Sequence, residues 1–114
     1  KKVVSLGYNG LPMGVEDSLE RLIDRDLKYE MTVHAEVNAV TTAALHGVST
    51  NGATAYVTFH PCSRCAAVLI NAGISTVVIS AHDINCDRWL DSFRLAAQLL
   101  NEAGIGHEIV DPEI

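Results

Sequence analysis

Positive charge and cysteine are both scarce in this sequence. Lys and Arg number 8 against 14 Asp and Glu, which gives a formal net charge of −6 at pH 7. A protein that tracks a nucleic-acid backbone needs clustered basic residues, so the composition argues against a nucleic-acid partner. The 3 cysteines are few and odd in number, which does not suit a disulfide framework. We therefore expect a reducing compartment and a cytoplasmic protein.

Long apolar runs and low-complexity stretches are also missing. No run approaches the roughly 18 residues that span a bilayer, so we expect no membrane partner. The hydrophobic fraction of 48% excludes a disordered chain. The length of 114 residues suits one core, and no linker divides it. We expect residues 1–114 to form a single domain, although the chain begins Lys1-Lys2 without an initiator Met.

What remains is an alternation of strand-like and helix-like segments. This pattern predicts an α/β fold in three layers, with helices covering a sheet. The last helix should turn Leu90, Phe93, Leu95, Ala96 and Leu99 inward. The expected strands are 3–8, 53–59, 76–80 and 106–110, and the expected helices are a short one within 15–29, then 32–45, 62–72 and 89–103.

Two motifs stand at predicted helix starts, and together they predict a metal site. Cys62 and Cys65 are three residues apart, so on a helix they share one face and can hold a single ion. The positive end of the helix dipole favours the thiolate form there. His34 opens the other helix and can bring an imidazole to the same ion. These three ligands suit zinc with a fourth position open, which indicates catalysis, because structural zinc sites have four protein ligands.

Glu36, two residues after His34, is too close in sequence to be a comfortable fourth ligand. Its carboxylate could instead take a proton from a water molecule at the metal and pass it to a leaving amine. This chemistry suits the hydrolytic removal of ammonia from an amidine-like carbon. Taken singly, a C-x-x-C pair could be structural, redox-active or incidental, and a His-Ala-Glu helix start could be a surface pattern. Their conjunction favours catalysis.

The H-x-E and P-C-x-x-C motifs together are those of the zinc deaminases. Within that cytidine-deaminase-like superfamily, the chain resembles the deoxycytidylate (dCMP) deaminases over nearly its whole length. The most discriminating segment is Gly-Tyr-Asn-Gly-Leu-Pro at 7–12. The other matching segments are Gly14, residues 33–39, residues 55–58 and residues 72–74.

The resemblance implies an α/β/α fold with a mixed central sheet and a hydrolase that converts dCMP to dUMP and ammonia, in pyrimidine nucleotide metabolism. It implies Glu36 as the proton shuttle. It implies substrate contacts from Asn9, from the Ala35 backbone and from His82. The zinc ligands it implies are His34, Cys62 and Cys65.

The family also implies regulation and assembly. Its members are typically hexamers, and many are activated by dCTP and inhibited by dTTP, with Mg²⁺ able to accompany the effector. Backbone N–H groups in a glycine-rich turn can hold phosphates without a basic patch. The resemblance places that nucleotide-responsive region at Gly7, Tyr8, Gly10 and Gly14.

The sequence departs from the family in three places. A helix and a first strand usually precede the segment that begins here near Val3, and they normally contribute phosphate contacts. His60 stands where many relatives have an apolar or small residue, and His82 stands where some have Tyr. We expect Arg64 to face away from the metal. Cys86, four residues after His82, is more consistent with a substrate loop than with a second metal site.

Two other functions compete with dCMP deamination. A related deaminase could act on free cytidine or deoxycytidine, on a riboflavin precursor or on a tRNA base. The short Cys62-to-Cys65 spacing argues against the riboflavin type, and the acidic composition argues against RNA. A catalytically silent zinc or nucleotide-sensing domain is the third hypothesis, and an intact Glu36 argues against it.

Overall fold

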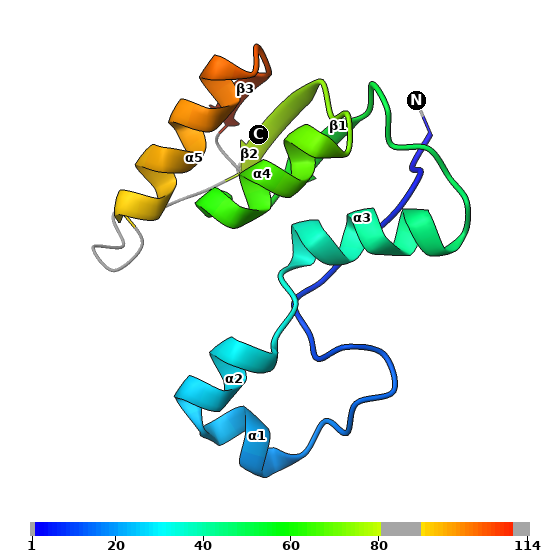
Figure 1. The fold of residues 1–114 in the computed structure, drawn as a ribbon, viewed down its shortest axis with the longest axis vertical. Coiled ribbons are helices and arrows are strands. Elements are labelled where there is room, and N and C mark those ends of the chain that lie inside the picture. Colours follow the sequence, from blue (N-terminus) through cyan, green and yellow to red (C-terminus); the bar gives the residue numbers. More distant parts are fainter. Residues whose placement is uncertain (1, 81–89, 111–114) are drawn as a thin grey trace.

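The computed structural model describes residues 2–80 and 90–110. Within them the chain forms five helices and three strands (Figure 1). The elements are α1 Leu19–Ile23, α2 Arg25–Met31, α3 Ala35–Leu45, β1 Thr54–Val57, α4 Ser63–Asn71, β2 Thr76–Ser80, α5 Leu90–Glu102 and β3 Gly106–Val110.

The three strands form a parallel sheet in the order β1-β2-β3. Val57 pairs with Ile79, and Ile79 pairs with Ile109. Each pair of neighbouring strands is joined through a helix, α4 between β1 and β2 and α5 between β2 and β3. Because the strands are parallel, β1 and β2 end at the same edge of the sheet, and the loop that leads from β1 into α4 starts there.

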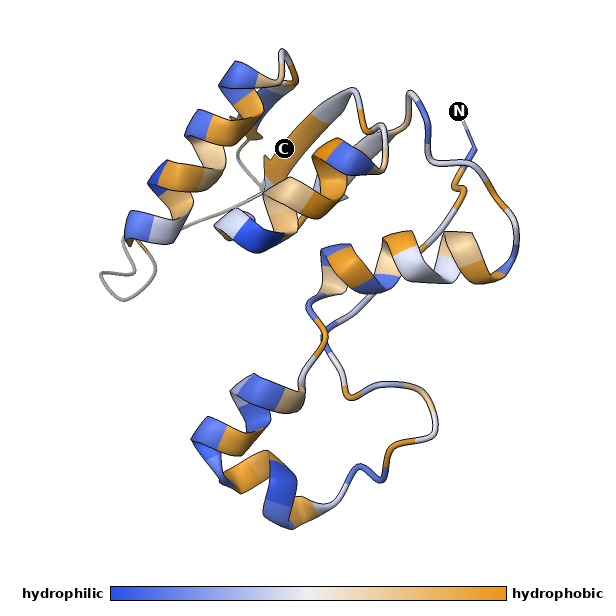
Figure 2. Cartoon of the chain, in the orientation of Figure 1, coloured by the Kyte–Doolittle hydropathy of each residue, from blue (hydrophilic) through white to orange (hydrophobic). Residues whose placement is uncertain are grey.

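The core lies between this sheet and the helices α4 and α5. Val77 and Ile79 of β2 are fully buried and belong to one cluster with side chains of both helices. Figure 2 shows β2 as hydrophobic, whereas α4 and α5 carry both hydrophobic and hydrophilic bands. The other buried members of the cluster are Ala66, Leu69, Ile74, Ala96 and Leu100. The predicted α/β fold is confirmed.

The inward side of α5 differs in part from the prediction. Phe93 and Ala96 are buried as expected, but the third buried position is Leu100. Leu95 and Leu99 are 53% and 37% exposed. The buried positions are three and four residues apart, so they form one narrow stripe, and its Ala96 and Leu100 belong to the core cluster with side chains of α4 and β2. Leu95 and Leu99 lie off that stripe.

The predicted strand at residues 3–8 is wrong. This segment runs without strand pairing beside α3, and Val3, Leu6 and Tyr8 are each 78% exposed. Its polar contacts go to the helix instead, because the Ser5 hydroxyl donates to the carbonyl oxygen of Ala39 at 2.7 Å. An apolar, β-branched segment becomes a strand only beside another strand edge, and the described residues place none next to it.

The short helix predicted within 15–29 is present as two short helices, α1 and α2, which are separated at Asp24. The Asp24 carboxylate accepts a hydrogen bond from the Leu27 backbone N–H at 3.1 Å and so caps α2, while Ser18 caps α1. Neither helix has a buried residue. The two helices form an arm whose neck is the antiparallel bridge between Gly10 and Val33 (Figure 1).

Helix α4 begins within one residue of its predicted start at 62, whereas α3 begins at Ala35 and not at 32. α3 starts directly after His34, and α4 starts directly after Cys62. Glycines with positive φ follow both ends, Gly47 at 70° and Gly73 at 82°, which is the backbone that glycine adopts without strain at a helix C-terminus. In the part of the chain that the structure describes, no helix combines the length and the apolarity needed to cross a membrane.

Candidate metal and catalytic site

His34 and Cys62 occupy the same structural position on two different helices. His34 is the N-cap residue of α3 and Cys62 is the N-cap residue of α4, and neither side chain caps its own helix by a hydrogen bond. Cys65 lies one turn into α4 and is 1% exposed. Because α3 and α4 pack against each other, the two helix starts bring these three side chains together.

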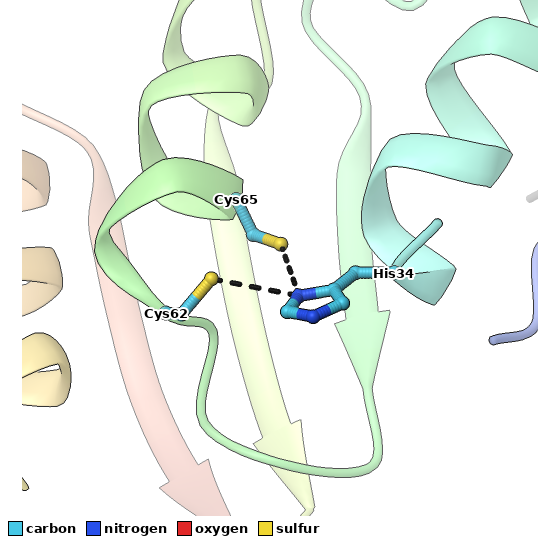
Figure 3. A group of neighbouring side chains, drawn as sticks. All are labelled: His34, Cys62 and Cys65. Atoms are coloured by element: carbon cyan, nitrogen blue, oxygen red, sulfur yellow. Dashed lines mark hydrogen bonds between the residues drawn. The ribbon is translucent and has the colours of Figure 1, made fainter. Parts of the chain in front are cut away.

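The three side chains point at one another (Figure 3). Nδ1 of His34 lies 3.2 Å from Sγ of Cys65 and 3.6 Å from Sγ of Cys62. All three donor atoms lie within 4.8 Å of one another. A tetrahedral zinc ion with one nitrogen and two sulfur ligands would hold nitrogen and sulfur about 3.5 Å apart, given Zn–N and Zn–S bonds of about 2.0 and 2.3 Å. The donors therefore fit zinc in both type and spacing.

Hydrogen bonding between the cysteines makes their acidities unequal in the metal-free centre. The hydrogen bond from Cys65 lowers the pKa of Cys62 to about 5, with further help from His34. The same hydrogen bond raises the pKa of Cys65 above its usual range, and burial and the nearby Glu36 carboxylate raise it further. Of the two cysteines, Cys62 is therefore the one that more readily forms the thiolate, which is the form that binds a soft metal.

A small pocket opens beside these donors. Its volume is about 140 Å³, and it is lined by Asn9, His34, Glu36, Phe59, His60, Cys62 and Phe93. Glu36 lies in the first turn of α3 and is half-buried. The Glu36 carboxylate and two of the candidate metal ligands, His34 and Cys62, therefore line one pocket, and the rest of its wall is Asn9 and the three aromatic rings.

Asn9 and Ala35 are joined directly. The Ala35 backbone N–H donates to Oδ1 of Asn9 at 2.7 Å. The Asn38 amide donates to the Tyr8 carbonyl oxygen, also at 2.7 Å. Residues 8 and 9 are therefore attached to the first turn of α3 at two points. Sequence reasoning anticipated Asn9 and Ala35 as separate substrate contacts and missed both their hydrogen bond and Asn38.

The glycine-rich segment has structural constraints of its own. A Cβ on Gly7 would lie 2.5 Å from the Ala39 backbone nitrogen, so only glycine fits against α3 there. Gly10 pairs with Val33 at the neck of the arm. Gly14 has a φ of 83° in a turn where a Cβ would meet no other atom within 4 Å. These constraints concern the backbone, and nucleotide binding by the segment stays a prediction.

The other residues that the sequence singled out have different outcomes. His82 and Cys86 lie outside the described residues, so their roles stay predictions. Arg64 is exposed between the two buried or half-buried cysteines, as predicted. His60 is buried, and its Nδ1 lies 2.9 Å from the carbonyl oxygen of Pro61. No sequence signal marked the aromatic wall around His60, because Phe93 comes from a distant helix.

Fold and site define an α/β domain in which two helix starts bring together a His/Cys/Cys group that could hold a metal ion. The family model of the cytidine and deoxycytidylate deaminase zinc-binding region matches residues 1–81, and the chain belongs to this family. Membership and the His/Cys/Cys group together support zinc as the metal.

Relatives of known sequence and structure agree with the resemblance that the motifs indicated. An uncharacterised deaminase of Aliivibrio fischeri is 35% identical over 105 residues, which are 91% of this chain and 69% of that protein. Human deoxycytidylate deaminase is 34% identical over 111 residues, which are 91% of this chain and 58% of that protein. The chain thus spans less than two thirds of the human protein.

A solved structure shares the fold. The dCMP deaminase of cyanophage S-TIM5, in complex with dCMP and dUMP, aligns with a TM-score of 0.66 at 22% identity and covers 91% of this chain and 70% of that chain. At this identity the likeness concerns the fold alone. It agrees with the parallel sheet and the helix packing described above.

Proposed function

We propose that this protein deaminates dCMP hydrolytically to dUMP and ammonia. The observation that carries the proposal is the convergence of His34, Cys62 and Cys65 beside a pocket that His34, Cys62 and Glu36 line. Relatives named deoxycytidylate deaminase support the choice of dCMP. In the proposed roles, His34, Cys62 and Cys65 hold zinc and Glu36 is the catalytic acid and base.

The reaction exchanges a C–N bond for a C–O bond. A bound zinc ion supplies Lewis acidity toward the attacking water. Glu36 takes a proton from that water and delivers it to N3 of the ring while oxygen bonds to C4. Glu36 then takes the second proton from the new hydroxyl on C4 and passes it to the amino group, so the C4–N bond breaks, ammonia leaves and the C4 oxygen becomes the carbonyl of dUMP. A positioned carboxylate that moves protons in this way contributes typically 10²–10⁴-fold in rate.

Pocket size indicates how the substrate would lie. Pockets for drug-sized ligands measure roughly 300–1,000 Å³, whereas this one measures about 140 Å³. The base would enter between the aromatic wall and the metal ligands. The sugar would then lie at the exposed mouth near Asn9, with the phosphate beyond it. His82, which follows β2 in the sequence, would add a contact by analogy with the family.

We extend the proposal to assembly and regulation on family grounds. A homohexamer would bind dCTP as activator and dTTP as inhibitor through the segment of Gly7, Tyr8, Gly10 and Gly14, with Mg²⁺ accompanying the effector. The cytoplasm suits a protein with few cysteines and reduced zinc-ligating thiols. Residues 1–114 would act as a single deaminase domain.

A substrate panel tests the proposal. The zinc-loaded full chain is incubated with cytidine, deoxycytidine, dCMP and dCTP, and ammonia release is measured with and without dCTP and Mg²⁺ as effectors. We expect release with dCMP that exceeds release with deoxycytidine at least tenfold. Preference for a nucleoside would move the protein to another substrate within the family. Zinc binding without turnover of any substrate would favour the silent sensing domain.

A further inference from the structure

Neither of the two helices that carry the proposed metal ligands has a typical N-cap residue. Ser, Thr, Asp or Asn normally occupies this position and accepts a hydrogen bond from a backbone N–H in the first turn. Here the position holds His34 in α3 and Cys62 in α4, and neither makes that hydrogen bond. An N-cap side chain accepts from the second or third helical residue, so the first N–H of each helix, at Ala35 in α3 and at Ser63 in α4, needs an acceptor from another segment in any case.

Each helix obtains such an acceptor from elsewhere in the chain. In α3 it is Asn9, which accepts from the Ala35 N–H. In α4 it is Ser92 of α5, whose Oγ accepts from the Ser63 backbone N–H at 2.9 Å and lies 3.3 Å from the Ser63 hydroxyl. Ser63 directly follows the metal ligand Cys62. The neighbouring helix α5 packs along α4 (Figure 1).

Phe93, the residue after Ser92, contacts Phe59 and His60, which precede Pro61 between β1 and α4. The Phe93 ring packs edge-on against Phe59, with centroids 5.4 Å apart, and lies 5.0 Å from the His60 ring. Nδ1 of His60 can donate its hydrogen to the carbonyl oxygen of Pro61, which lies 2.9 Å away. The first turn of α5 thus contacts the segment 59–63 both before and after Pro61.

We propose that Ser92 is a positioning residue of the metal centre. By accepting from the N–H of Ser63, it holds the backbone directly after Cys62 and so fixes the direction in which the Cys62 sulfur faces His34 and Cys65. The inference rests on the ligand set of the proposed function but concerns metal binding and not the substrate. Without the Ser92 hydroxyl, the Ser63 N–H loses its partner, and the backbone that carries Cys62 is held less firmly. Groups that orient metal ligands typically change metal affinity 10–100-fold when they are removed.

Metal affinity of the full chain tests this role directly. Zn²⁺ affinity is measured by competition with a chromophoric chelator, and ligand geometry is measured from the absorption spectrum of the Co²⁺-loaded protein. We expect Ser92→Ala to weaken Zn²⁺ binding 10–100-fold and to change the Co²⁺ spectrum. Ser92→Thr keeps a hydroxyl and should remain within threefold of the unmodified chain with an unchanged spectrum.

Ser75→Ala is the matched control. The Ser75 hydroxyl also bonds to a backbone group, the Gly52 carbonyl oxygen at 3.1 Å, but it lies before β2 at the opposite end of the sheet from the metal centre. This variant loses a comparable hydrogen bond and should retain its Zn²⁺ affinity. Equal Zn²⁺ affinity in Ser92→Ala and Ser75→Ala would overturn the proposal.

Ser63→Pro offers a second test that does not depend on Ser92→Ala being stable alone. Proline is favoured at the first helical position and has no N–H to cap. Cys62 has φ −74° and ψ 170°, which suits a residue before proline. In the Ser63→Pro background, adding Ser92→Ala should change Zn²⁺ affinity less than threefold. A further tenfold loss would show that Ser92 acts otherwise than through the Ser63 N–H.

The two proposals fail separately. If the unmodified chain binds zinc and does not deaminate dCMP, the substrate assignment is wrong and the role of Ser92 is still measured by metal affinity. If dCMP is turned over while Ser92→Ala keeps full Zn²⁺ affinity and an unchanged Co²⁺ spectrum, the positioning role is wrong and the proposed function stands.

Discussion

The Asn9 side chain accepts a hydrogen bond from the first backbone N–H of α3, at Ala35, which is 26 residues away in the sequence. Its Oδ1 accepts the Ala35 N–H at 2.7 Å, although the helix itself begins after His34. This N–H is one of the four at a helix start that have no partner within the helix. The segment that contains Asn9 therefore supplies the hydrogen-bond acceptor that the helix start after His34 lacks.

Replacement of Asn9 by Ala should destabilise the protein. Loss of an N-cap acceptor costs about 1 kcal/mol in the free energy of unfolding, which denaturant unfolding can measure. Asn9→Asp keeps an acceptor oxygen and should retain most of that stability. Asn101→Ala, an exposed position near the end of α5, is the control. If Asn9→Ala were as stable as Asn101→Ala, the cap would contribute nothing.

Gly7 should tolerate no side chain. A Cβ there would lie 2.5 Å from the Ala39 nitrogen and 3.0 Å from its Cα, and the backbone of a helix cannot yield as a side chain does. We expect Gly7→Ala to lower the free energy of unfolding by about 1–3 kcal/mol, as overpacking does. Gly106→Ala has its nearest neighbour at 3.9 Å and should stay within about 1 kcal/mol. Equal stability of the two variants would mean that the approach of residue 7 to α3 is not close.

Local patterns were enough to predict where α4 begins and which side chains form the His/Cys/Cys group that could hold a metal ion. Pro61 before a helix, two cysteines one turn apart and Gly73 at the end are each informative within a few residues. Contacts between distant segments had no such signal. The hydrogen bond of Ser63 to Ser92 spans 29 residues, and nothing in either neighbourhood marks it.

The wrong prediction of a strand at residues 3–8 also has its cause in contacts between distant segments. Residues 3–8 have a strand-like composition, but strand formation depends on a partner edge and not on composition alone. β1, β2 and β3 were predicted correctly because the α4 and α5 crossovers bring their edges together. Leu95 and Leu99 were assigned to the core by periodicity, yet the width of the buried stripe depends on how α5 packs against α4, which the sequence pattern does not contain.

Glu36→Gln should separate metal binding from catalysis. Glutamine keeps the shape of the side chain but cannot accept and return a proton, so we expect kcat with dCMP to fall about 10²–10⁴-fold. The zinc content should remain one ion per chain, because the proposed ligands are unchanged. Glu108→Gln, an exposed position on β3, serves as the control. Turnover by Glu36→Gln at the rate of Glu108→Gln would refute the proton-shuttle role.

Removal of zinc should expose an unusually acidic thiol. The pKa of Cys62 is lowered to about 5 from the ordinary value of 9.0 by its hydrogen bond with Cys65, and only the thiolate is alkylated. An ordinary thiol loses about tenfold in alkylation rate for each pH unit below its pKa, so it slows about a hundredfold between pH 8 and pH 6. Because the pKa of Cys62 lies below that range, its rate in the chelated protein should change less than about threefold. Iodoacetamide labelling followed by mass spectrometry measures the rate at each cysteine, and added Zn²⁺ should suppress labelling of Cys62. A hundredfold decline at Cys62 between pH 8 and pH 6 would show that the hydrogen bond between the two cysteines does not form in the metal-free protein.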